Sequence, residues 1–417
     1  MGMFNYFSVS VFLVVMLLCV MLNLVGCSNS LLGGADIIFS NYFVVDSVSV
    51  YLIVLVVLLG IYSQLFFFGC LSLLTRLLLF LSLVCSILCF CVNHSVLFWC
   101  FYELSMLPLL YLIFSESPYS ERFLAGWYFS CYLLVTSLPL LLMLLYMSVV
   151  EGSFLFDSWC GTEYGIWVFV IVCFIFFTKV PLFPFHTWLP IVHAEASSIV
   201  SIFLSGYIMK LGLLGVYRCS SYLLNFEFML YLFFCCLVGV LFLVVSSSEL
   251  DGKRWLAFLS LAHIVVPFLA FFVSGWDSIN LSFFYCLGHG LSAGVIFGLL
   301  WYFYVLTNTR NWLLLKSGIS GSGVLVVLIV SLLSLCSFPP TIQFFCEVGI
   351  VSLSGGVFVY FLFWCFYLFL GGLVPLVLCG HLLLRVESIE VCSNSVFSYL
   401  NFLIILCVWC YFSFMFL

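Results

Sequence analysis

Five ionisable residues stand well inside long apolar runs of this 417-residue sequence, and proton transfer is the chemistry that their types allow. An uncompensated charge at the centre of a lipid bilayer costs at least about 2.5–3.5 kcal/mol, so a charged side chain kept at such a depth is a candidate for function. Each of these side chains needs either a partner of opposite charge or contact with water. The five residues are Glu103, Lys179, Lys210, His289 and Glu347.

Two of these residues carry opposite charges, and a third has no acid beside it. Pairing of Glu103 with Lys179 would lower the cost of burying each and leave both able to exchange a proton, whereas a static structural pair is the alternative. Lys210 has no acidic residue within its own segment. Burial favours the neutral form of such a lysine, which proton transfer requires.

His289 lies between two glycines, Gly288 and Gly290, which predicts close packing of its helix against a neighbour. An imidazole held there is suited to relaying protons, and an ordinary buried core histidine is the alternative. Three other histidines fall nearer the ends of apolar segments, where the core interpretation is favoured: His94, His263 and His381.

The composition requires a lipid environment for these residues. Hydrophobic residues make up 66% of the chain and charged residues only 6%, against about a quarter in an ordinary soluble domain. No basic patch for nucleic acid is present. The 21 cysteines are scattered through apolar runs without paired ligand spacings, so they are expected to be small buried hydrophobic residues and not metal ligands.

Polar or turn-forming interruptions divide the chain into about thirteen apolar segments, most of them near the roughly 20 residues that a crossing helix needs. The runs are continuously apolar and lack the alternating period of barrel strands, so the predicted fold is an all-α polytopic membrane protein. The segments are 8–26, 46–67, 70–92, 94–114, 122–150, 166–190, 197–218, 227–246, 254–273, 277–306, 322–352, 355–381 and 397–417.

The loop cations test this count, because cationic loops tend to stay on the side of synthesis. With thirteen spans and the N-terminus on that side, Arg218 is the one loop cation that falls opposite. The cations that fall on the side of synthesis are Arg76, Arg122, Lys253, Arg254, Arg310, Lys316 and Arg385.

Proline interrupts two of the spans at comparable places. Pro181 and Pro184 follow Lys179 in the sixth span, and Pro339 and Pro340 break the eleventh just before Glu347. Because these spans lie five apart, they cross in opposite directions, as expected of inverted repeats whose broken helices frame a transport site, although ordinary proline kinks are the alternative. The predicted organisation is N-terminal helices over 1–69, five-helix repeats over 70–218 and 227–385, and a last helix over 386–417.

Several motifs in the same order resemble the antiporter-like subunits of respiratory complex I, with the best agreement in the subunit 4 branch. The resemblance runs from about residue 90 to 350. The motifs are Phe101-Tyr-Glu103-Leu with Pro108, Lys179-Val-Pro-Leu-Phe-Pro-Phe-His186-Thr-Trp-Leu-Pro190, His193-Ala-Glu195-Ala, Lys210-Leu-Gly-Leu-Leu-Gly, Asp251-Gly-Lys253, His289-Gly-Leu and Pro339-Pro-Thr-Ile with Glu347.

This resemblance implies a subunit of the mitochondrial inner membrane that moves protons while quinone is reduced elsewhere in the complex. Glu103 and Lys179 would be the coupled pair, Lys210 and His289 the central relay, and Glu347 the distal acid. No cofactor is expected in this chain, since NADH, FMN, iron–sulfur clusters and ubiquinone belong to other parts of the complex. Other complex I subunits, especially the antiporter-like subunits 2 and 5, and membrane lipid are the expected partners.

Two departures from the family pattern and two competing functions accompany this expectation. Family members usually have fourteen spans, and lack of the first would place the N-terminus in the matrix and the C-terminus in the intermembrane space. Gly252 stands where the family usually has leucine or isoleucine.

The first competing function is a subunit of a multisubunit sodium/proton antiporter or of a membrane-bound hydrogenase. The second is a structural membrane scaffold whose charges merely pair.

Overall fold

The chain folds into a bundle of helices with one small sheet, seen in a computed structural model. The predicted first span, 8–26, lies outside the residues that the structure describes, as do Lys316 and Arg385 of the charge count. The described residues are 37–67, 71–159, 165–220, 228–274, 279–315, 321–384 and 394–413.

The other twelve predicted spans each correspond to a continuous helix or to a run of shorter helices, so the all-α prediction is confirmed. The continuous helices are α2 (Ser47–Phe66), α3 (Leu73–Cys91), α4 (Ser95–Glu116), α5 (Arg122–Val150), α10 (Phe228–Ser248), α13 (Ile279–Thr307), α17 (Phe358–Leu383) and α18 (Asn394–Phe412). Within the described part of the chain, eight helical stretches are long and apolar enough to cross a membrane: α3, α4, α5, α10, α13, α17 and the composite stretches 198–219 and 252–271.

Four spans are built from more than one helical piece, and the two breaks predicted at proline are among them. Helix α6 (Ile166–Lys179) ends before Pro181, and α7 (Trp188–Glu195) continues that span. Likewise α15 (Gly321–Leu335) ends before Pro339 and α16 (Ile342–Ser354) follows. The remaining pieces are α8 (Ser198–Phe203), the π-helix η2 (Leu204–Ile208) and α9 (Met209–Ser220), then α11 (Gly252–His263) and α12 (Val265–Ser274).

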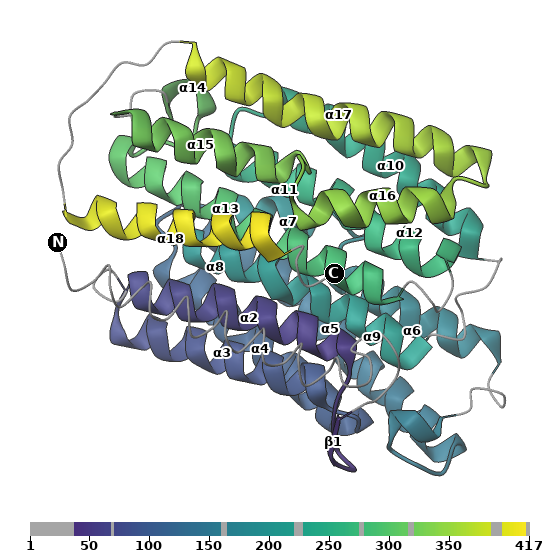
Figure 1. The fold of residues 1–417 in the computed structure, drawn as a ribbon. Coiled ribbons are helices and arrows are strands. Elements are labelled where there is room, and N and C mark those ends of the chain that lie inside the picture. Colours follow the sequence, from purple (N-terminus) through teal and green to yellow (C-terminus); the bar gives the residue numbers. More distant parts are fainter. Residues whose placement is uncertain are drawn as a thin grey trace.

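Three short elements join the spans. The antiparallel strands β1 (Ile37–Ser40) and β2 (Phe43–Val45), which the sequence analysis did not anticipate, form a hairpin at one end of the bundle (Figure 1). The 3₁₀ helix η1 is Phe156–Ser158, and α14 is Trp312–Leu315. Beside the hairpin, Asp46 caps α2 and also pairs with Arg218 at 2.9 Å, so this cation, the exception in the loop-charge count, is compensated.

The helices form a buried centre and a lipid-facing exterior. The stretch 198–219 and helix α13 are buried along their whole lengths, whereas only 39% of the apolar window of α10, and the same share of that of α17, is buried. In Figure 1, α2, α3 and α4 lie on one flank of the bundle and α10 and α17 on the other. The outer faces expose large apolar side chains such as Phe80 and Phe369, as expected of surfaces in contact with hydrocarbon.

Glycine at position 290 allows the two central elements to approach each other closely, as the sequence predicted for this helix. A Cβ built on Gly290 would stand 3.0 Å from the carbonyl oxygen of Gly206 in η2 and 2.6 Å from a methyl carbon of Leu55. The backbone carbonyl of Gly206 cannot move aside to make room for a Cβ, whereas the end of the Leu55 side chain can. Gly290 therefore sets the distance between α13, which carries His289, and the π-helix that precedes Lys210.

Replacing Gly290 with alanine should weaken the bundle, because overpacking of a dense core costs about 1–3 kcal/mol. We expect less assembled protein and a lower temperature of dissociation, measured by native gel electrophoresis after a heat challenge. Gly380→Ala is the matched control, since an added Cβ there meets nothing within 4 Å. Equal stability of the two variants would contradict the close approach at Gly290.

Candidate functional site

Glu103 and Lys179 meet inside the bundle as the sequence predicted. Lys179, at the end of α6, places its Nζ 3.6 Å from Oε1 of Glu103 on α4, and both residues are buried. The ammonium also donates to the carbonyl oxygen of Leu133 on α5 at 3.1 Å. This pair is held loosely, at a distance beyond that of a hydrogen bond, which leaves the carboxylate free to take other contacts.

Lys210 is completely buried and has no carboxylate partner within the described ranges. Its Nζ donates to the carbonyl oxygen of Ser205 at 2.5 Å and lies 3.1 Å from Nδ1 of His289. Ser205 belongs to η2, and a π-helix changes the backbone hydrogen-bond pattern so that a carbonyl becomes open to a side chain. The local geometry of η2 thus supplies the contact that a carboxylate would otherwise give.

Helices α6 and α9 bring Lys179 and Lys210 into the same region. A Cβ on Gly215 would stand 2.2 Å from the Phe176 ring, so glycine is needed for α9 to pack directly against α6. A cavity of about 10 Å³ borders both Lys179 and Ile208, two residues before Lys210. Such a cavity has room for about one water molecule.

His289 continues the polar contacts away from Lys210 towards a second histidine. The His289 and His263 rings are 5.6 Å apart between centroids, and both residues are buried. The Nε2 atoms of both rings have no hydrogen-bond partner among the described residues. The two imidazoles are therefore neighbours, and a water molecule that reached both nitrogens would connect them.

Two tyrosines connect His263 to Glu347. The hydroxyl of Tyr367 lies 2.5 Å from Nδ1 of His263 and donates to Oε1 of Glu347 at 3.1 Å. Tyr285 makes a longer parallel connection, 3.2 Å from the same nitrogen and 3.4 Å from the same oxygen. Ser337, in the break between α15 and α16, donates to that oxygen at 2.9 Å. Within the described ranges, Glu347 is therefore held by three hydroxyl groups and by no cation.

All five predicted residues are buried, Glu103 beside Lys179 in one group and Lys210 connected through His289 towards Glu347 in another; we call these residues, together with those that join them, the polar chain. The sequence analysis did not include three of its members, because His263 lies near a predicted segment end and the tyrosines lie among many other aromatic residues. The polar chain consists of Glu103, Lys179, Lys210, His289, His263, Tyr285, Tyr367 and Glu347.

The side chains of the polar chain are all of types that can take up and release protons. Carboxylate, ammonium, imidazole and phenol each gain or lose a proton without further chemical change. No group of three or more histidine, cysteine or acidic residues that could hold a metal occurs in the part of the chain that the structure describes. His94, left outside the candidate residues, caps α4 by accepting a hydrogen bond from the Leu97 amide.

The sequence is similar to a known protein family and to proteins of known name. Residues 92–373 match the family described as NADH:quinone oxidoreductase/Mrp antiporter, TM. NADH-ubiquinone oxidoreductase chain 4 of Rhipicephalus sanguineus is 27% identical over 332 residues, which cover 76% of this chain and 72% of the relative. The protein of the same name from Artemia franciscana is 32% identical over 263 residues, which cover 62% of this chain and 67% of the relative.

Solved structures share the fold at low sequence identity. A chain of respiratory complex I from Thermus thermophilus with bound NADH superposes with a TM-score of 0.77 at 19% identity, covering 87% of this chain and 80% of that one. A chain of the Mrp complex from Dietzia sp. DQ12-45-1b gives a TM-score of 0.71 at 18% identity, covering 85% of this chain and 69% of that one. These likenesses concern the fold alone.

Proposed function

Because the chain belongs to the NADH:quinone oxidoreductase/Mrp antiporter membrane family, we propose that it is a proton-translocating membrane-arm subunit of respiratory complex I. Relatives named NADH-ubiquinone oxidoreductase chain 4 support the choice of complex. The observation that carries the proposal is the polar chain, a set of titratable groups buried inside a lipid-facing bundle.

The proposed mechanism moves protons and leaves electrons to other subunits. Quinone reduction elsewhere in the complex changes the Glu103–Lys179 pairing, and the altered field of that pair changes the proton affinity of Lys210. Lys210 then passes a proton to His289, with which it is in contact, and the proton reaches Glu347 through His263 and the tyrosines. We expect this chain to hold no redox cofactor of its own.

The proposed setting is the mitochondrial inner membrane, where the chain acts with other complex I subunits. We expect subunits 2 and 5, the other antiporter-like subunits, to be its neighbours. The distribution of loop cations supports a matrix location for the end of the bundle that carries Arg122, Lys253 and Arg310. The N-terminus would then lie in the matrix and the C-terminus in the intermembrane space.

A subunit of a multisubunit sodium/proton antiporter is the second candidate, and the fold shared with the Mrp complex favours it. The two candidates differ in what purifies with the chain. A native complex that contains this chain and oxidises NADH with quinone supports the first, whereas antiporter subunits without NADH oxidation support the second.

Replacing Glu103 with glutamine tests the proposed coupling. The amide keeps the size of the carboxylate but cannot pair as an ion with Lys179, whose Nζ stands 3.6 Å away. We expect pumping-coupled NADH oxidation to be abolished while the complex still assembles, measured on proteoliposomes with a pH-sensitive dye and on native gels. Full activity in this variant would refute the role of Glu103.

A further inference from the structure

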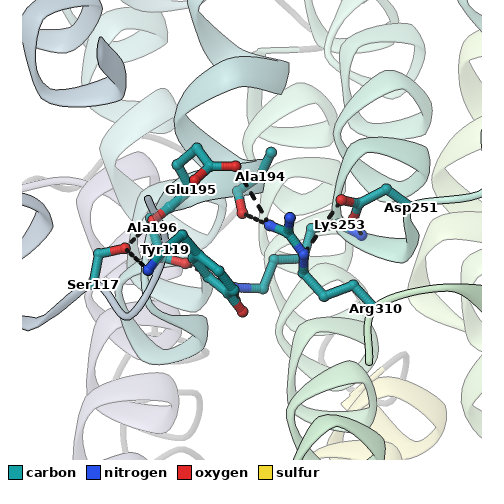
Figure 2. Close-up of polar contacts among 8 residues, drawn as sticks. All are labelled: Ser117, Tyr119, Ala194, Glu195, Ala196, Asp251, Lys253 and Arg310. Atoms are coloured by element: carbon teal, nitrogen blue, oxygen red, sulfur yellow. Dashed lines mark hydrogen bonds and ion pairs between the residues drawn. The ribbon is translucent and has the colours of Figure 1, made fainter. Parts of the chain in front are cut away.

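Helix α7, which continues the sixth span after its break, is fixed at its C-terminal end by side chains from three other segments (Figure 2). Three successive carbonyl groups there carry the negative pole of the helix and accept hydrogen bonds. Arg310 donates to the carbonyl of Ala194, Ser117 to that of Glu195, and Lys253 to that of Ala196 at 2.7 Å. These bonds tie the end of α7 to the loop before α5, to α11 and to the segment before α14.

Arg310 makes further contacts that strengthen this attachment. Its guanidinium pairs with Glu195 at 3.6 Å and with Asp251 at 3.4 Å, and its guanidinium carbon lies 4.2 Å from the ring centroid of Tyr119. Asp251 in turn caps the start of α11. We call the side chains that contact the end of α7, together with Asp251 and Tyr119, the end cluster. Arg310 thus joins the last turn of α7 to the first turn of α11.

At the other end of α7, a side chain replaces a backbone hydrogen bond that the break removes. Pro181 has no amide hydrogen to donate to Phe177, and the amide of Leu182 takes that carbonyl at 3.1 Å. The carbonyl of Thr178, which Leu182 would reach in an unbroken helix, accepts instead from the indole nitrogen of Trp188 at 3.0 Å. Trp188 is the first residue of α7, so this bond joins the start of α7 to the last turn of α6.

The ring of Trp188 packs on the helix that holds the ammonium group of Lys179. It is buried and lies 5.6 Å from Phe129 and 6.2 Å from Tyr132, both on α5, between ring centroids. The next residue of α5, Leu133, provides the carbonyl to which Lys179 donates. Trp188 therefore contacts both segments that place this lysine, α6 through its nitrogen and α5 through its ring.

The break between α15 and α16 has the same backbone hydrogen bonds but no tryptophan. Helix α6 ends at Lys179, and α15 ends at Leu335 in the corresponding place. In this register Phe344, whose side chain has no donor, corresponds to Trp188. The indole thus accompanies the break that ends in lysine. The bonds from amide to carbonyl are Val180 to Phe176, Leu182 to Phe177 and Phe185 to Leu182 at the first break, and Cys336 to Leu332, Phe338 to Leu333 and Thr341 to Phe338 at the second.

The pairing of Lys179 with Glu103 depends on where the end of α6 is held. The two charged groups are 3.6 Å apart, and the ring centroid of Tyr102 lies 5.5 Å from the ammonium nitrogen. The attraction between two charges falls with distance, and the four-carbon stem of a lysine is flexible. The separation of this pair is therefore set by the backbone position of Lys179, which the bond to the preceding carbonyl fixes.

We infer that Trp188 is a positioning residue for Lys179, and that α7, anchored by the end cluster, holds Trp188 in place. Helix α7 has eight residues and is about 12 Å long, so its two attachments lie at the ends of one short element. The indole fixes the Thr178 carbonyl, and with it Lys179, at the distance from Glu103 that coupling needs. This inference rests on the proposed function and adds a residue that acts through Lys179 and carries no proton itself.

Two variants of Trp188 in the assembled complex test the role of the indole N–H. Trp188→Phe keeps a ring against α5 and removes the donor, whereas Trp188→His carries an N–H in its five-membered ring, as the indole does. We expect pumping-coupled NADH oxidation per assembled complex to fall at least about fivefold in Trp188→Phe, because a small misplacement of a reacting group is costly, and to stay within about twofold of wild type in Trp188→His. The KM values for NADH and quinone should not change.

The matched control for the indole is Trp159→Phe. Trp159 is also buried, and its nitrogen donates to a backbone carbonyl, that of Ser153, at 2.9 Å in the loop after α5. We expect wild-type pumping per assembled complex in this control. Native gels give the amount of complex, so a partial loss of assembly does not affect the comparison.

A variant of the end cluster tests the other attachment of α7. Arg310→Met removes the bond to Ala194 and the pairing with Glu195 and leaves Trp188 intact. We expect pumping-coupled NADH oxidation per assembled complex to fall at least about twofold, since the anchored end of α7 is loosened. Arg254→Met is the matched control, because this arginine is an exposed cation in the first turn of α11. It should pump normally.

Wild-type pumping in Trp188→Phe overturns the inference. An equal loss in Trp188→Phe and Trp188→His does so too, because the shape of the ring and not its N–H would then matter. If Trp188→Phe does not assemble, Arg310→Met decides, and normal pumping there overturns the inference. In each case inactivity of Glu103→Gln in the same assay leaves the proposed function standing, whereas full activity in Glu103→Gln overturns the proposed function itself.

Discussion

Methionine in place of Lys210 should abolish pumping-coupled NADH oxidation, with a residual rate at least about tenfold below that of the unaltered complex. Proton transfer by a positioned side chain contributes about 10²–10⁴-fold to a rate, and Lys210 is the group in direct contact with His289. Methionine fills a similar volume and cannot carry a proton. The measurement is the number of protons moved per NADH oxidised in proteoliposomes.

The same variant separates pumping from a scaffold role. Removal of Lys210 leaves the Ser205 carbonyl and Nδ1 of His289 without this partner, at about 1–3 kcal/mol each. It also removes a buried group that has no carboxylate partner among the described residues, and this acts in the opposite direction. We therefore expect little change in the thermal stability of the complex. A scaffold predicts the reverse pattern, with stability altered and pumping intact.

Burial of the five ionisable residues was predictable because charge inside an apolar run is expensive wherever it occurs. The pairing of Glu103 with Lys179 followed from opposite charge, and the close packing around His289 followed from its flanking glycines. The two broken helices followed from proline, which cannot donate a backbone hydrogen bond. These predictions depend on local chemistry that each segment carries by itself.

The connections between the five residues could not be predicted, because they depend on how separate helices pack. Tyr285 and Tyr367 are two of 22 tyrosines in a chain that also has 50 phenylalanines, and nothing in their spacing distinguishes them. His263 became part of the polar chain only because α11, α13 and α17 meet at one level. The carbonyl that holds Lys210 depends on a π-helical turn, for which the sequence has no clear signal.

Lys253 makes a buried contact that the loop-charge rule does not predict. The loop-charge count treated it as an ordinary cation at the membrane surface. In the structure it starts α11, is only 2% exposed and donates to the end of α7. The rule concerns the side of the membrane and says nothing about depth, so a lysine at a helix start can satisfy the rule and still be buried.

Replacement of Glu347 with glutamine should block the distal end of the polar chain without disturbing its shape. All three hydroxyl groups around this residue donate to one carboxylate oxygen, Oε1, and an amide oxygen can accept the same bonds. The amide cannot take up or release a proton at any pH of the assay. We expect at least about a tenfold loss of pumping-coupled NADH oxidation, again measured on proteoliposomes, with normal assembly.

Tyr367→Phe is the second variant at this end of the polar chain, and its loss of pumping is to be compared with that of Glu347→Gln. It removes the shorter connection between His263 and Glu347 and leaves Tyr285, at 3.2 Å from the imidazole and 3.4 Å from the carboxylate, as the longer one. Because a second route remains, the loss of pumping should be clearly smaller than in Glu347→Gln. If Tyr367→Phe is as inactive as Glu347→Gln, Tyr285 carries no protons; if Glu347→Gln pumps normally, the path does not end at Glu347.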